Sequence, residues 1–372
     1  MDLATLIDRF GTPNVLLAGG VAVGFLFGAF AQQSRFCLRS AVIEFRRREP
    51  GTKLAVWLFA FSVALAGVQG AIMAGWLDVS QSRMIAVTGS MSGAAIGGVL
   101  FGIGMVSARG CATRLLVLSA TGNLRALLAG LVFAVTAQSA YRGLLAPLRE
   151  AIADWWLIEG GADREIVSLL GGGPGLGLAI GLVWLAAGLA VALYSRVGAR
   201  LLLFAVGAGL AIPAGWLLTY TVSQASFDLV AVESLTFSGP SAELLMLVVA
   251  PYEKALGFSI GIMPGVFLGS FTAAFLTGEL KVEMFDSGHT MPRYIVGAVL
   301  MGFGAMLAGG CAVGAGVTGG SILAVTAWTT LIGMWAGAMA ADWAFVHFGE
   351  PAGSVSSPQI PEFAEHTAAR LR

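Results

Sequence analysis

The sequence predicts an all-α polytopic membrane protein with about nine spanning helices, short re-entrant half-helices and two pseudo-symmetric repeats. Of its 372 residues, 57% are hydrophobic and only 11% are charged, whereas about a quarter of the residues in soluble domains are charged. The mean hydropathy is +0.84. The 52 glycines suit close helix packing in a bilayer. The formal net charge is zero, so the composition gives no indication of a nucleic-acid partner.

Nine apolar runs are long enough to cross a lipid bilayer, which takes about 20 residues. They lie near 14–32, 54–77, 84–106, 124–146, 176–194, 200–220, 255–277, 294–308 and 322–346. Four shorter apolar stretches lie between them, at 38–45, 112–119, 229–237 and 312–318. Because a helix rises about 1.5 Å per residue, such stretches cover roughly half of a bilayer. We expect them to be interfacial helices or re-entrant half-helices.

An internal repeat is visible in the sequence. The segment GGVLFGIGMVSARGCA (97–112) aligns without gaps to GAVLMGFGAMLAGGCA (297–312), with nine of 16 positions identical. A weaker match pairs residues 24–37 with 215–228, placing Gln33 opposite Gln224. Repeats with a substrate site at their interface are typical of secondary transporters.

These matches predict how the chain is divided. Residues 1–349 form a single transmembrane domain with repeat halves at about 14–146 and 204–340. A more polar connection at about 147–175 joins the halves, and residues 350–372 form a polar C-terminal tail.

Three cysteines, Cys37, Cys111 and Cys311, lie far apart in the sequence, and none belongs to a CxxC pair. This spacing argues against a disulfide framework and against a zinc site. The three histidines lie outside the centres of the apolar segments, which argues against haem. We therefore expect no metal and no cofactor.

Each cysteine follows a glycine-rich or polar break and opens a short apolar segment. If that segment is a half-helix, its free amides and the positive end of its dipole face the break. Gly110, Gly309 and Gly310 precede two of the cysteines and would let a ligand approach the backbone closely. The pattern predicts a passage for a small anion.

The side chains around the breaks refine this prediction. The polarizable S–H group suits a soft, sulfur-bearing anion and binds it weakly enough to allow release. Arg109 and Arg114 flank Cys111 and would either attract the anion or extend to the membrane interface. Gln33 and Gln224 would either line the route or satisfy backbone groups at a broken helix.

The motifs SRFCLRSA, ARGCATR and GFGAMLAGGCAVGAGVTGGSILAVTAW resemble those of the YeeE/YedE family of bacterial inner-membrane proteins, and the resemblance covers nearly the whole chain. It implies uptake of a sulfur-containing ion, best established for thiosulfate, with some members linked to selenium. It also implies that Cys37, Cys111 and Cys311 relay thiosulfate by S–H···S contacts. A small TusA-like sulfur-carrier protein is the partner that the family implies.

We therefore predict a transporter, not an enzyme, that takes up thiosulfate or a closely related sulfur anion across the inner membrane and crosses that membrane in several passes. A competing hypothesis is a membrane sulfurtransferase that hands sulfane sulfur to a TusA-like carrier, using a thiolate near Arg109. The sequence also fits a transporter of a selenium-containing compound, or a structural subunit with packing cysteines.

Overall fold

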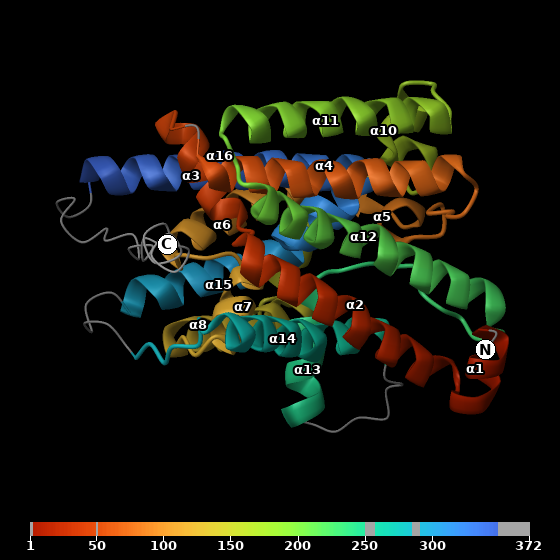
Figure 1. The fold of residues 1–372 in the computed structure, drawn as a ribbon, viewed down its shortest axis with the longest axis horizontal. Coiled ribbons are helices and arrows are strands. Elements are labelled where there is room, and N and C mark those ends of the chain that lie inside the picture. The colour runs from red at the N-terminus through yellow and green to blue at the C-terminus, as the bar shows by residue number, and fades with distance from the viewer. Residues whose placement is uncertain (1–2, 50, 250–256, 285–290, 349–372) are drawn as a thin grey trace, which may run out of the picture.

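The computed structural model describes residues 3–49, 51–249, 257–284 and 291–348, which form a bundle of helices (Figure 1). Nine stretches of this described chain are long and apolar enough to cross a membrane. Their main helices are α2 (Thr12–Ser34), α4 (Thr52–Met73), α6 (Met91–Ser107), α8 (Leu124–Arg142), α11 (Pro174–Tyr194), α12 (Ala199–Ala225), α14 (Phe258–Thr277), α15 (Met291–Leu307) and α16 (Val325–Phe348). Each overlaps one expected apolar run, so the all-α membrane fold is confirmed. The predicted tail at 350–372 lies outside the described residues.

Three of the four short apolar stretches are short helices that follow a spanning helix after a break. They are α3 (Leu38–Arg47), α7 (Ala112–Ala120) and the π-helical η2 (Ala312–Gly319). The expectation of a short helix at 229–237 was wrong, because the chain there is irregular. Side chains satisfy part of its backbone instead: Thr318 Oγ1 donates to Leu235 O at 2.6 Å. Irregular backbone is tolerated in a membrane protein where neighbouring groups supply such bonds.

The remaining elements are short. They are α1 (Leu3–Phe10), α5 (Arg83–Ala86), α9 (Ala146–Ala153), η1 (Ala162–Arg164), α10 (Ile166–Leu169) and α13 (Ser238–Val249). Two two-residue strands, β1 (Gly89–Ser90) and β2 (Leu157–Ile158), pair antiparallel.

The polar connection near 147–175 folds over one end of the bundle. Arg164, which is 5% exposed, donates to Val87 O and, at 2.7 Å, to Thr326 Oγ1. The backbone amide of Ile166 donates to Leu323 O at 2.9 Å. The connection is thereby attached to the start of α16, just after η2. We call this end of the bundle, toward the right in Figure 1 where α5 and α10 lie, the vestibule end.

Ion pairs mark the opposite end of the bundle. Asp342 near the end of α16 pairs with Arg46 and, at 3.3 Å, with Arg47 of α3. Arg35, just after α2, pairs with Glu279, just after α14, also at 3.3 Å. We call this end, toward the left in Figure 1 where α3 lies, the basic end.

Helices α6 and α15 pack face to face through glycines of the repeated motif. A Cβ atom added at Gly97 would lie 2.6 Å from Gly304 O, and one added at Gly104 would lie 2.6 Å from Gly297 O. Gly97 and Gly297 are equivalent positions of the two matched segments, as are Gly104 and Gly304. The repeat therefore relates the two contacts. Replacing each glycine by its equivalent turns the contact of Gly97 with Gly304 into the contact of Gly297 with Gly104. Small residues at such crossings let the backbones approach closely.

Candidate anion pathway

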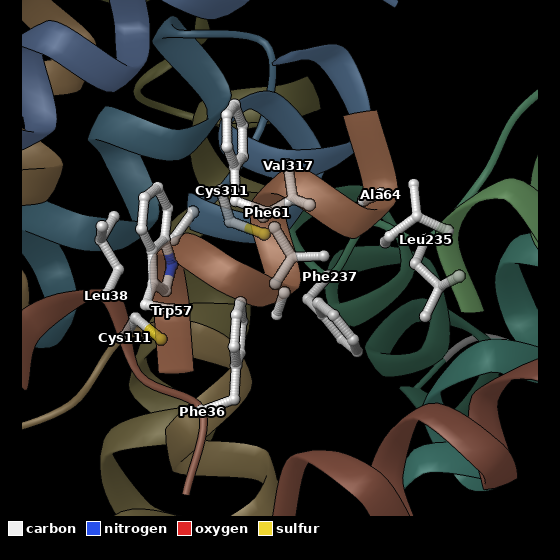
Figure 2. Packing of buried hydrophobic residues seen from close by; sticks show 14 of the residues in the cluster. Phe36, Leu38, Trp57, Phe61, Ala64, Cys111, Leu235, Phe237, Cys311 and Val317 are labelled. Atoms are coloured by element: carbon white, nitrogen blue, oxygen red, sulfur yellow. The ribbon is translucent and has the colours of Figure 1, made fainter. Parts of the chain in front are cut away.

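All three cysteines occupy the position just before a short helix. Cys37 precedes α3, Cys111 precedes α7 and Cys311 precedes η2. Their exposed fractions are 6%, 1% and 0%, so all three are buried. Figure 2 shows Cys111 and Cys311 among buried apolar side chains that include Trp57 and Phe237.

The breaks share one backbone feature. The residue two positions before each cysteine is left-handed: Arg35 has φ 55°, Arg109 has φ 56° and Gly309 has φ 78°. This conformation ends a helix by turning the chain sharply, so a new helix can start at the cysteine. Glycine adopts it easily, whereas other residues adopt it at a cost of about 1–2 kcal/mol. The sequence indicated the break before Cys311 by its glycine, but it gave no such signal at the two arginines.

Gly110 and Gly310 lie next to their cysteines but differ in how tightly they are packed. A Cβ added at Gly310 would lie 2.6 Å from the backbone nitrogen of Ala315, inside the first turn of η2. At Gly110 the nearest atom would be Leu115 Cδ2 at 3.4 Å. Gly310 therefore allows the chain to fold tightly against η2, and Gly110 has slightly more space.

Helix amides lie close to each sulfur. The amide of Gly314 donates to Cys311 Sγ at 3.5 Å. The amides of Ser40 and Arg114, each three residues after a cysteine as Gly314 is, lie near the sulfurs of Cys37 and Cys111. They do not form a capping hydrogen bond with those sulfurs. The positive end of a helix dipole favours an anion at this position. The three breaks thus present a soft sulfur and oriented N–H groups together.

The structure brings Cys37 and Cys111 together. Their side chains lie close enough to interact with each other, although they begin different helices. Cys311 lies within electrostatic range of Cys111. The cysteines that the sequence separates therefore form one group inside the bundle, with Cys111 interacting with both of the others.

Arg114 lies beside this group. It interacts electrostatically with Cys37 and Cys111, and its Nη1 donates to Gln32 Oε1 at 3.4 Å. Gln32 Nε2 in turn donates to Glu279 Oε2 at 2.9 Å. Gln32 is 6% exposed and was not among the residues that sequence reasoning selected. Its position before the SRFC motif is the only signal that could have indicated it.

The structure places the two selected glutamines away from this chain of contacts. Gln33 Nε2 donates to Ala273 O and Thr277 Oγ1 of α14, both at 3.3 Å. Gln224 is exposed on the last turn of α12, where the following Ser226 Oγ pairs with Thr12 Oγ1 at 2.8 Å. Gln224 therefore lies at the vestibule end, and Gln33 holds α2 against α14.

Arg109 points toward the start of α15. Its Cζ lies 5.7 Å from the centre of the Tyr294 ring, and it interacts electrostatically with Arg39 and Arg293. Arg109 and Arg114 flank the same cysteine but have different surroundings, because Arg114 faces the thiols and α2.

A cavity of about 780 Å³ opens at the vestibule end. It is lined by Arg83, Arg149 and Arg164, and by Gly309, Ala315 and Thr318 of the Cys311 break and η2. The cavity therefore extends from the polar connection to the backbone around Cys311. In the described part of the chain, nine stretches long enough to cross a membrane, broken helices that meet inside the bundle and a cavity that reaches one of the breaks together define a membrane transporter.

Comparison with known proteins identifies the family. The family model described as "Sulphur transport" (YeeE/YedE) matches residues 33–340, and the chain belongs to this family. The chain is 28% identical over 345 residues to the Thiosulfate transporter TsuA of Escherichia coli (strain K12), covering 88% of this chain and 94% of that protein. It is 28% identical over 334 residues to the Thiosulfate transporter TsuA of Spirochaeta thermophila, covering 84% of this chain and 94% of that protein. The protein is thus a multi-pass transporter of sulfur compounds rather than an enzyme.

Proposed function

We propose that this protein takes up thiosulfate, or a closely related sulfur-containing anion, across the bacterial inner membrane. The anion enters the cavity at the vestibule end, meets Cys311, and then passes Cys111 and Cys37 toward the basic end. The contact between Cys37 and Cys111 supports this route most directly, because it joins two helix breaks into one path. The substrates named for the two relatives support the choice of thiosulfate.

The chemistry of the path fits a sulfur anion. Thiol groups are weak, polarizable donors that can interact with a terminal sulfur. A transit site must bind weakly enough to release its ion, so thiols suit the centre of the route better than guanidinium groups. Helix N-terminal amides lower the energy of negative charge at each break.

The basic end faces the cytoplasm in this proposal. Short loops rich in Lys and Arg stay on the cytoplasmic side of bacterial membranes, and the loop between α3 and α4, with its flanking turns, contains Arg46, Arg47, Arg48 and Lys53. A TusA-like carrier is the partner we propose for this side. The exposed side chain of Arg48 is available for such a contact.

The test is uptake of labelled thiosulfate into proteoliposomes by the wild type and by Cys37→Ala, Cys111→Ala and Cys311→Ala. We expect each substitution to lower uptake by about tenfold or more, the change that corresponds to about 1.4 kcal/mol, while the thermal unfolding temperature stays close to that of the wild type. The matched control is Ser223→Ala, on the last turns of α12 and outside the route. Normal uptake by all three cysteine variants would contradict the proposed role of the thiols in transport.

The buried thiols beside Arg114 also permit a sulfur-transfer reaction, in which a thiolate attacks the sulfane sulfur of thiosulfate, forms a persulfide and releases sulfite. Thiosulfate labelled separately on its two sulfurs distinguishes the two functions. Transport delivers both labels together to the vesicle lumen. Transfer leaves the sulfane label on a cysteine and releases the other label as sulfite.

A further inference from the structure

Three arginines from separate parts of the chain gather at the basic end. They are Arg39 of α3, Arg109 at the break after α6 and Arg293 in the first turn of α15, and we call them the arginine cluster. Arg39 interacts electrostatically with both other members, and Arg293 interacts with Arg109. All three side chains are half-buried, so water only partly screens their mutual repulsion.

Among the described residues, the cluster has little negative charge to balance it. Asp342 acts on Arg39, but this carboxylate already pairs with Arg46 and Arg47. Among the ion pairs of the described residues, none involves a member of the arginine cluster. The described side chains at the cluster therefore carry an excess of positive charge.

Several buried polar atoms at the cluster also lack a partner. The Nε atoms of Arg39 and Arg293 and the hydroxyl of Tyr294 are buried and make no hydrogen bond in the described structure. Tyr294 is 2% exposed and lies beside Arg109 and Arg125, whose Cζ atoms are 5.7 and 4.7 Å from its ring centre. Buried donors without partners are rare in proteins because each one is costly, and a bound anion would satisfy them.

The cluster is also held in place by its neighbours. The guanidinium carbon of Arg293 lies 3.6 Å from the centre of the Phe345 ring on α16, and stacking of this kind orients a guanidinium group. Arg39 interacts electrostatically with Cys37 as well as with the other two arginines. The cluster is therefore next to the last thiol of the proposed route.

We propose that the arginine cluster binds a small oxyanion with three or more oxygens on the release side of the pathway. Planar guanidinium groups match such oxygens with paired N–H bonds. For a transported sulfur anion the cluster takes the oxygen-bearing end as the sulfur end leaves Cys37, and this role rests on the proposed function. Sulfate has the oxygens but no sulfane sulfur, so it binds the cluster without using the thiols. Sulfate supplied on the side of the basic end therefore inhibits thiosulfate uptake.

Sulfate is therefore the probe for the first experiment. The full chain, purified in detergent, is heated with sodium sulfate or with sodium chloride at equal ionic strength. We expect sulfate to raise the unfolding temperature by about 2 °C or more above chloride, and expect Arg39→Gln and Arg293→Gln to remove most of this difference. Arg200→Gln, at the exposed start of α12, is the matched control and keeps it. An equal sulfate effect in all four proteins overturns the proposal.

Two further arms remove ambiguity. If a Gln variant does not fold, Arg293→Lys keeps the charge but loses the planar group, and we expect it to weaken the sulfate effect severalfold; an unchanged effect contradicts the site.

A lipid headgroup phosphate has the same chemistry as sulfate. Added phosphatidylglycerol that abolishes the sulfate effect assigns the cluster to lipid and overturns its role in release, whereas an unchanged effect supports that role.

The second experiment measures thiosulfate uptake with sulfate present at the basic end. We expect inhibition in the wild type and in Arg200→Gln, and at least about fivefold weaker inhibition in Arg293→Gln, in line with the loss of one charge-assisted contact. Inhibition that is equal in all three proteins contradicts a release-side site. If the wild type transports no thiosulfate but its sulfate-dependent stabilisation needs the cluster, the oxyanion site stands and the proposed function fails.

Discussion

The side chains of Cys37 and Cys111 lie close enough to interact, although one begins α3 and the other begins α7. Both are buried, and both follow a left-handed arginine by two residues. Two breaks of the same design thus meet inside the bundle. The meeting point lies beside Arg114, which extends a guanidinium group from the first turn of α7 toward Gln32.

This contact predicts selective cross-linking. Mild oxidation with diamide, which takes up the two thiol hydrogens, is expected to join Cys37 to Cys111 and to block uptake. Thiol counting by mass spectrometry should show the loss of two free thiols in the wild type and in Cys311→Ala. Cys37→Ala is the control and should retain both of its thiols. A bond between Cys111 and Cys311 instead would contradict the arrangement.

The crossing of α6 and α15 predicts a sharp difference between two glycines. At Gly297 an added Cβ would lie 2.5 Å from the backbone nitrogen of Ala108, whereas at Gly130 nothing lies within 4 Å. Gly297→Ala must push the helices apart and is expected to lower the unfolding temperature by several degrees, since overpacking costs about 1–3 kcal/mol. Gly130→Ala is expected to leave it unchanged or raise it slightly, because alanine favours helix. Equal effects in the thermal unfolding assay would refute the tight crossing.

Asp342 is expected to stabilise the basic end. Its side chain is 7% exposed and pairs with Arg46 and Arg47, so Asp342→Asn leaves two arginines without their carboxylate. Breaking a fully buried pair costs about 3–5 kcal/mol, and we expect less here because the Arg47 side chain is 39% exposed. The unfolding temperature should fall by several degrees. Asp154→Asn, at an exposed carboxylate after α9, should change it little, and an equal fall would contradict the prediction.

Much of the fold could be predicted because its signals are local. Each spanning helix is an apolar run of sufficient length, and the short helices after Cys37, Cys111 and Cys311 follow polar or glycine-rich breaks. Residues 229–237 were mispredicted because an apolar run does not show which groups satisfy its backbone. There, tertiary hydrogen bonds from Thr318 and Thr219 replace those of a helix.

The site was only partly predictable because it depends on how helices rotate against one another. Gln32 and Gln33 are adjacent in the sequence, yet Gln32 reaches Arg114 and Gln33 reaches α14. The direction of each side chain follows from the face of α2 that packs against α14, and glycine contacts such as Gly24 against Ile262 O determine that face.

By itself, the sequence determined an all-α membrane bundle with a cysteine at each of three helix breaks, because hydropathy, glycine breaks and repeated motifs are properties of short segments. The tertiary structure alone decided that Cys37 meets Cys111 and that Arg39, Arg109 and Arg293 gather at one end. Those groupings join residues from different helices. Close packing of small residues between the helices fixes their relative positions.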